Sequence, residues 1–168
     1  MEWVHPRKFG SHRIKSSAEL RELLVQNRHS CATHPLLLLY TSLGSIVAGL
    51  LHLGLWGRLL PCLLFCALGV ASCAFHWYVD VVFEPSSFWH NADKTLAYTG
   101  MAYHVFLLAN HWQSPLAYAA SCICFVSLIF YFRAYAAYEN HDFGKYVRIH
   151  SLWHVMASLG TILFSMLE

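Results

Sequence analysis

Apolar residues fall into five long runs along the chain, separated by short polar stretches. A helix needs about 20 predominantly apolar residues to cross the ~30 Å hydrocarbon core of a bilayer. The runs cover about residues 35–55, 59–79, 92–110, 115–134 and 147–167, and the third is the most polar. Together they use nearly every residue after His34. The pattern predicts an all-α integral membrane protein, a bundle of about five transmembrane helices that forms a single domain over residues 35–168.

Residues 1–34 have a different pattern, with six basic residues and no long apolar run. Ser16 and Ser17, followed by Glu19, are typical of a helix start. Residues 18–26 then predict a short amphipathic helix that lies at the membrane interface. A cleaved signal peptide is not expected, because the first apolar run is too long and leads straight into a second.

The composition supports a membrane protein. Apolar residues make up 57% of the 168 residues and charged residues only 12%, about half the charge of an ordinary soluble domain. Five of the six cysteines fall inside the predicted spans, and the chain contains no C-x-x-C pair. Buried free thiols are therefore expected rather than a zinc–thiolate site or a disulfide framework.

The distribution of charge predicts an orientation. If the chain is threaded through five spans, the N-terminal segment shares one side with the loops at about 80–91 and 135–146. Of the 11 Lys and Arg residues, all but Arg58 lie on that side or at its edge. Positive residues stay cytoplasmic, so the N-terminus is expected in the cytosol. The basic side favours an anionic membrane surface as its neighbour and not a nucleic acid.

Candidate chemistry lies in the polar residues inside the spans, where ionisable groups are costly and usually functional. His150 and His154 stand four residues apart on the last span, a spacing that offers two nitrogen ligands from one helical face. Ser72 and His76 repeat that spacing on the second span, and Asp93 opens the third. The expected topology puts these residues within roughly 10 Å of one depth. Three imidazoles and a carboxylate from three helices are therefore predicted to converge, in the pattern of a catalytic zinc site.

Each of these residues also has an ordinary structural interpretation. His52, His104 and His111 are expected to bond to neighbouring helices and not to bind metal. Ser72 alone would bond back to the carbonyl four residues earlier. Asp93 alone would pair with a nearby basic residue at the membrane boundary. Asp80, one turn beyond His76, is expected to be an interfacial charge, and Glu84 or His90 could contact a lipid head group.

The motifs Ser72-Cys-Ala-Phe-His76, Asp93 within His-Asn-Ala-Asp-Lys, and His150-Ser-Leu-Trp-His154 resemble the signature of the CREST superfamily. That group contains alkaline ceramidases, adiponectin and progestin receptors with their hemolysin III-like relatives, GPI-lipid remodelling proteins and myomaker-like proteins. Its members usually have seven spans. The chain therefore resembles a shortened form, in which a second copy in a homodimer could supply the missing walls.

The resemblance implies a zinc-dependent hydrolase of a lipid amide or ester in the endomembrane system or plasma membrane. His76, His150 and His154 would bind Zn²⁺ on the cytosolic side, Asp93 would act as general base, and Ser72 would donate to the oxyanion. Two alternatives stay open. One is a non-catalytic receptor-like or fusion-type factor whose zinc joins helices. The other is a haem protein that uses His104 with His52 or His154.

Overall fold

The computed structural model describes residues 8–9, 12–13, 36–78, 87–140 and 142–167. Five helices make up almost all of this part: α2 (Leu36–Trp56), α3 (Leu59–His76), α4 (Ser87–Asn110), α5 (Pro115–Glu139) and α6 (Phe143–Ser165). A short antiparallel ladder joins β1 (Lys8–Phe9) to β2 (His12–Arg13). The predicted all-α bundle of five helices is confirmed. The helix predicted over residues 18–26 lies outside the described residues.

The helix ends follow local sequence signals. Gly57 takes a φ of 65°, in the left-handed region that favours glycine, and its N–H donates to the Leu53 carbonyl at the end of α2. Pro115 opens α5, where its missing N–H costs no helical bond. Asp142 caps α6 by accepting a hydrogen bond from the Lys145 backbone N–H at 3.0 Å.

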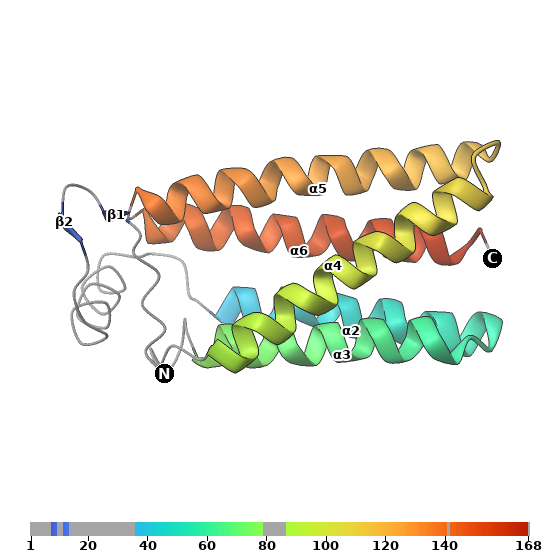
Figure 1. Ribbon diagram of the computed structural model, residues 1–168, viewed down its shortest axis with the longest axis horizontal. Helices are drawn as coiled ribbons and strands as arrows, with labels where there is room; N and C mark the ends of the chain where they lie inside the picture. The colour runs from blue at the N-terminus through green and yellow to red at the C-terminus, as the bar shows by residue number, and fades with distance from the viewer. Residues whose placement is uncertain (1–7, 10–11, 14–35, 79–86, 141, 168) are drawn as a thin grey trace.

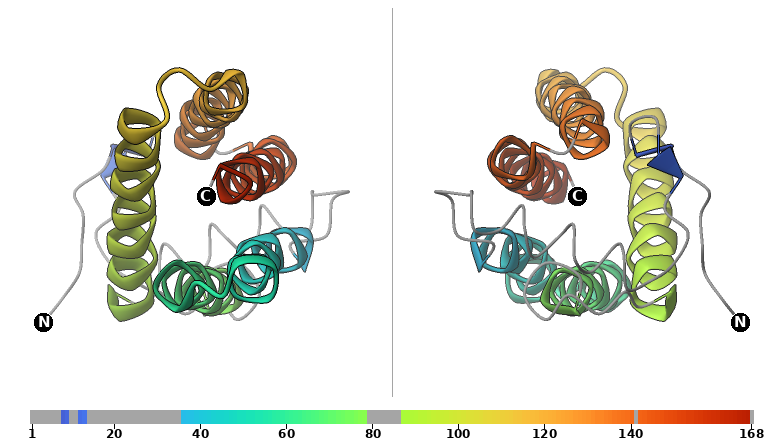
Figure 2. Two further views of the ribbon diagram at one scale, coloured as in Figure 1. Left: turned by 90° about the vertical axis from the view of Figure 1, so that its right-hand side faces the viewer. Right: turned by 90° about the vertical axis from the view of Figure 1, so that its left-hand side faces the viewer.

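The five helices form an arch rather than a compact square (Figure 2). α2 packs against both α3 and α6, α5 packs against α6, and α4 lies along α3. Figure 1 shows α4 crossing the bundle at a tilt, from the end of α3 to the beginning of α5. The α2–α3 and α4–α5 connections lie at one end of the bundle. The other end, where α3 and α5 finish and α4 and α6 begin, carries the polar cluster described below.

The burial pattern is that of a protein surrounded by lipid. Many large apolar side chains are exposed on the outer surface, including Leu60, Phe88, Phe125 and Phe132. The buried polar side chains lie mostly on α6, α2 and α3, and they are Ser42, His52, Ser72, His76, Ser127, His150, Ser151, His154, Ser158, Thr161 and Ser165. α2, α3 and α5 are each long and apolar enough to cross a membrane. The chain is therefore a multi-pass membrane protein, with its polar groups turned inward.

Close contact between α2 and α6 depends on Gly44. A Cβ atom at this position would lie 2.6 Å from Ser158 Oγ and 2.9 Å from Ser158 Cβ. Small residues let membrane helices approach each other closely in this way. The contact matters for the site because Ser42, two residues before Gly44, and His154, four residues before Ser158, meet across the same seam.

Candidate metal centre

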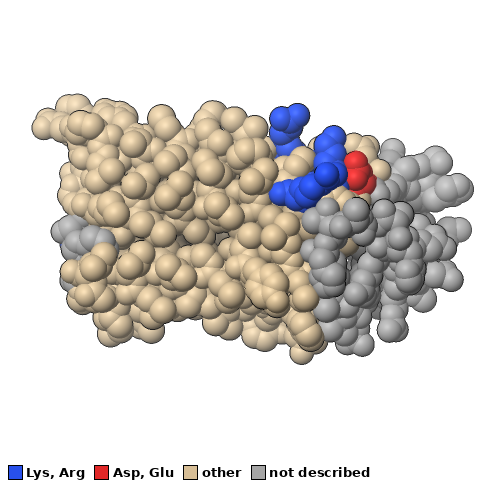
Figure 3. Space-filling view, turned by 180° about the vertical axis from the view of Figure 1, so that it is seen from behind, with Lys and Arg blue, Asp and Glu red and all other residues tan. Residues whose placement is uncertain are grey.

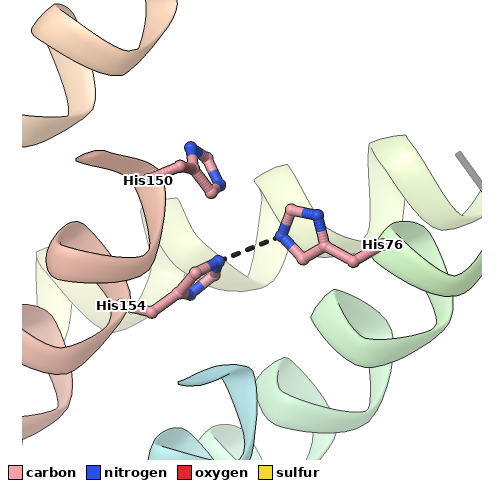
Figure 4. Close-up of side chains that lie close together, drawn as sticks. All are labelled: His76, His150 and His154. Atoms are coloured by element: carbon pink, nitrogen blue, oxygen red, sulfur yellow. Dashed lines mark hydrogen bonds between the residues drawn. The ribbon is translucent and has the colours of Figure 1, made fainter. Parts of the chain in front are cut away.

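Three buried histidines from two helices meet near one end of the bundle (Figure 4). His76 is the last residue of α3, and His150 and His154 lie one turn apart in the first half of α6. Their spacing puts both α6 imidazoles on the same helical face. All three side chains are buried, and one ligand nitrogen from each lies within 4.8 Å of the others. The predicted convergence of the three histidines is therefore present.

The closest pair within this histidine triad is His76 and His154, whose Nε2 atoms are 3.0 Å apart. Two neutral imidazoles at this distance need one shared proton, because one nitrogen must donate and the other accept. His150 stands edge-on to both, with ring centroids 5.1 Å from His76 and 4.8 Å from His154. A shared proton can join only one pair of rings. The hydrogen bond between His76 and His154 therefore does not explain why the His150 imidazole also lies beside them.

The donor set fits a metal ion. Tetrahedral zinc with Zn–N distances of about 2.0–2.1 Å places its ligand nitrogens about 3.3 Å apart. The His76–His154 pair at 3.0 Å is already near this separation, and ring rotation would bring in the third nitrogen. Three nitrogen ligands also leave a fourth position, as in catalytic zinc sites. The histidine triad could therefore hold a metal ion, with imidazole donors that suit zinc, copper, iron and nickel.

Ser72 and Asp93 lie beside the triad. Ser72, one turn before His76 on α3, is buried. Asp93, near the start of α4, lies close enough to Ser72 and His76 for both to influence its carboxyl. Lys94 also influences the Asp93 carboxyl. The structure thus brings the three predicted histidines together from α3 and α6, with Ser72 one turn away on α3, and the roles of all five residues remain predictions.

Ser42 on α2 belongs to the same cluster and was not predicted. Its side chain is completely buried, and its Oγ lies 3.1 Å from Ser72 Oγ and 3.5 Å from His154 Nε2. No feature of the sequence distinguishes Ser42 from Thr41 or Ser45. Only the packing of α2 between α3 and α6 selects it.

Aromatic rings enclose the triad. Tyr146 and Trp153 lie 5.0 and 4.8 Å from the His150 ring. On the α3 side, Phe75 contacts both His76 and His90, each at a centroid separation of 5.1 Å. The triad therefore has aromatic neighbours on both its α6 side and its α3 side.

The other histidines of the spans lie apart from the triad. His52 and His104 each stack on Phe65, with ring centroids 5.7 and 5.4 Å away, and His104 also stacks on Phe164 at 4.7 Å. Aromatic packing in the opposite half of the bundle therefore occupies both rings. His111 follows α4 and is half-buried. Asp80 and Glu84 lie outside the described residues.

Comparisons with known proteins add no family. A scan against protein-family models found no match to the chain, and neither the curated proteins nor the solved structures contained a match.

Proposed function

We propose that this chain is a zinc-dependent membrane hydrolase that cleaves an amide or ester bond of a lipid on the cytosolic side of the bilayer. The observation that carries the proposal is the buried histidine triad with Asp93 and Ser72 beside it. The resemblance of these five positions to the CREST superfamily points to the same chemistry.

The site contains the groups that hydrolysis needs. His76, His150 and His154 would hold the zinc ion through their ring nitrogens. A bound zinc ion supplies Lewis acidity, which polarises a carbonyl and lowers the pKa of a water molecule. Asp93 would take the proton of the attacking water as general base and then pass it to the leaving amine or alcohol as the C–N or C–O bond breaks. Ser72 would donate to the developing oxyanion.

The membrane explains why the substrate would be a lipid. α4 and α6, with 24 and 23 residues, are about 35 Å long and match the three apolar helices in length. All five helices would then cross the bilayer, and their exposed apolar faces would meet acyl chains. A lipid could enter sideways between helices with its head group at the interface, while a second copy could complete the walls of the site.

The charged side chains support a cytosolic site. Those visible in Figure 3 gather at one end of the molecule, the end at which α5 finishes and α6 begins. The exposed charged residues of these two helix ends are Arg133, Glu139, Asp142, Lys145 and Arg148. Basic residues mark the cytoplasmic side. The basic N-terminal segment would attract anionic lipids to the same surface.

The test is lipid turnover by purified protein in vesicles loaded with zinc. Vesicles would contain ceramide, a phospholipid or an acylated glycolipid, and mass spectrometry would measure release of free fatty acid. Wild type should release fatty acid from one class. Asp93→Asn should keep zinc and lose about 10²–10⁴-fold in rate, the usual contribution of a general base. An unchanged rate in Asp93→Asn would exclude Asp93 as the base.

A second candidate function is a non-catalytic membrane factor with a structural zinc ion. α3 and α6 both pack on α2, and the triad joins these two helices directly. A metal ion bound there would link α3 to α6 and stabilise the arrangement of the helices. Stoichiometric zinc, a large loss of stability on chelation and no turnover of any of the three lipid classes would favour this function.

A further inference from the structure

The outer face of α4 carries a regular row of exposed residues, which we call the α4 stripe. Its members alternate four and three residues apart along the helix, and they are Asn91, Thr95, Tyr98, Ala102, Val105 and Ala109. This is the spacing of a helix seam, in which every residue of the row faces a second helix. On the opposite side of α4, Gly100 is buried, and a Cβ there would lie 3.1 Å from the Phe65 ring on α3. The α4 stripe therefore points away from α3, at one side of the arch (Figure 2).

The α4 stripe differs in chemistry from the exposed faces of the neighbouring helices. The exposed large side chains of α2 are Leu37, Tyr40, Leu43, Val47, Leu50, Leu53 and Leu55. Those in the middle of α6 are Leu152, Val155 and Leu159. The α4 stripe has instead three polar residues and two alanines, and Val105 is its one larger aliphatic residue. Small residues and hydrogen-bonding side chains are typical of contacts between membrane helices, whereas lipid tails favour leucine-like surfaces.

Tyr98 is the member of the stripe that lipid tails satisfy least. It lies in the middle of α4, which runs from Ser87 to Asn110, and its side chain is 63% exposed. Within the part of the chain that the structure describes, its hydroxyl has no hydrogen-bond partner. If all five helices cross the bilayer, this hydroxyl lies near the centre of the hydrocarbon core, and not at the interface where membrane tyrosines usually lie. An unpaired hydroxyl is costly at that depth, so a hydrogen-bonding partner stabilises this face more than lipid does.

We infer that the α4 stripe is the interface of a homodimer, in which α4 of one chain packs in parallel against α4 of a second copy. Two copies of a membrane protein have the same orientation, so their two-fold axis lies along the membrane normal. Such an axis places each stripe residue opposite its own counterpart at the same depth. The inference rests on the proposed function only in that α4 crosses the bilayer, and it does not depend on catalysis.

A second copy suits the stripe because the stripe is complementary to itself. The Asn91 amide and the Thr95 and Tyr98 hydroxyls can each donate and accept, so each can form a hydrogen bond with an identical group. The stripe contains no Lys, Arg, Asp or Glu, and therefore no like charges meet across the axis. Ala102 and Ala109 let the two backbones approach closely toward the end of α4.

The interface can be mapped by oxidative cross-linking of the full-length protein in membranes, in a cysteine-free background. Thr95→Cys, Tyr98→Cys and Ala102→Cys should each give disulfide-linked dimers, because a parallel two-fold pair brings each of these positions next to its counterpart. Met101→Cys and Val155→Cys are the matched controls and should give almost no dimer. Met101 is exposed on α4 but lies beside the stripe, and Val155 is exposed on α6. Equal yields at stripe and control positions, or no dimer at any stripe position, would overturn the inference.

A second measurement needs no new cysteine. Fluorescence energy transfer between two labelled populations in phosphatidylcholine vesicles, at decreasing protein-to-lipid ratio, gives the dissociation constant of the dimer. Tyr98→Phe, which removes only the hydroxyl, should raise this constant about 3- to 10-fold, the effect of one hydrogen bond between membrane helices. Ala102→Leu should raise it about 10-fold or more, because the larger side chain separates the two helices. Val155→Leu on α6 should leave it unchanged.

The outcomes separate this inference from the proposed hydrolase. A wild type that stays monomeric at every protein-to-lipid ratio, or a wild-type dissociation constant in Ala102→Leu, would overturn the dimer. Lipid turnover by a monomeric wild type would reject the dimer and keep the hydrolase. A dimer that cross-links through the stripe and turns over no lipid would keep the dimer and reject the hydrolase.

Discussion

Replacing Gly44 by alanine would add a methyl group to the seam between α2 and α6. The new Cβ would stand 2.6 Å from Ser158 Oγ and 2.9 Å from Ser158 Cβ, where ordinary carbon contacts are about 3.5–4.0 Å. Rotating Ser158 would move its Oγ, but its Cβ is fixed to the α6 backbone. The helices would therefore have to separate by a few tenths of an ångström to about 1 Å, a typical case of overpacking.

The expected cost of Gly44→Ala is about 1–3 kcal/mol of unfolding free energy. The assay is equilibrium unfolding in mixed micelles, followed by helical circular dichroism. Gly54→Ala is the matched control, because Gly54 also lies on α2 and a Cβ there meets nothing within 4 Å. That change should be neutral or stabilise the protein by up to about 1 kcal/mol, since alanine favours the helix over glycine.

A double-mutant cycle identifies the cause. Ser158→Gly removes both atoms that the new methyl group meets, so Gly44→Ala should cost little when it is made in that background. Zinc binding should also weaken in Gly44→Ala, since Ser42 and His154 meet across the same seam. Equal stabilities of Gly44→Ala and Gly54→Ala, or an undiminished cost in the Ser158→Gly background, would refute this account of the seam.

Three further predictions follow from the same structure. At a free zinc concentration 100 times the Kd of the site, bound zinc should raise the unfolding free energy of the wild type by about 2.7 kcal/mol, and chelation should remove this gain. Thermal or detergent unfolding would measure the difference, and chelation should leave the stability of His150→Ala unchanged. Phe65→Ala should lower the unfolding free energy by about 3–5 kcal/mol in the same assay, because the Phe65 ring is only 2% exposed and fills the space between His52 and His104. The fraction of this variant that folds should still bind zinc. In a cysteine-free background, an impermeant thiol reagent should label Arg58→Cys and leave Lys145→Cys unlabelled in intact cells that carry the protein at their surface; the reverse pattern would contradict the predicted orientation.

The helices were predictable because each corresponds to a long run of mostly apolar residues in the sequence. α2 and α3 begin within one residue of the predicted apolar runs, since a span must be apolar over its whole length. α4 begins at Ser87 and not near residue 92, and α5 continues to Glu139 and not about residue 134. Those extensions consist of polar or aromatic turns beyond the apolar core, which hydropathy does not register as part of a helix.

The candidate site was predictable only where the helix period and topology fixed it. His150 and His154 share a face because they are four residues apart, and antiparallel threading brings His76 to the same depth. Ser42 could not be found in this way. Its place in the cluster depends on which face of α2 turns toward both α3 and α6. Because α2 is apolar on the side that faces lipid and on the side that faces other helices, its sequence has little periodicity that would identify the buried face.

The most direct test of the metal centre is the zinc content of protein purified from zinc-supplied cells, together with X-ray absorption at the zinc edge. The wild type should hold one zinc per chain with nitrogen ligands at about 2.0–2.1 Å. His76→Ala, His150→Ala and His154→Ala should each lose most of it, while His111→Ala, outside the triad, should keep it. No stoichiometric zinc in the wild type, or full zinc content in the His150→Ala/His154→Ala double variant, would contradict the assignment.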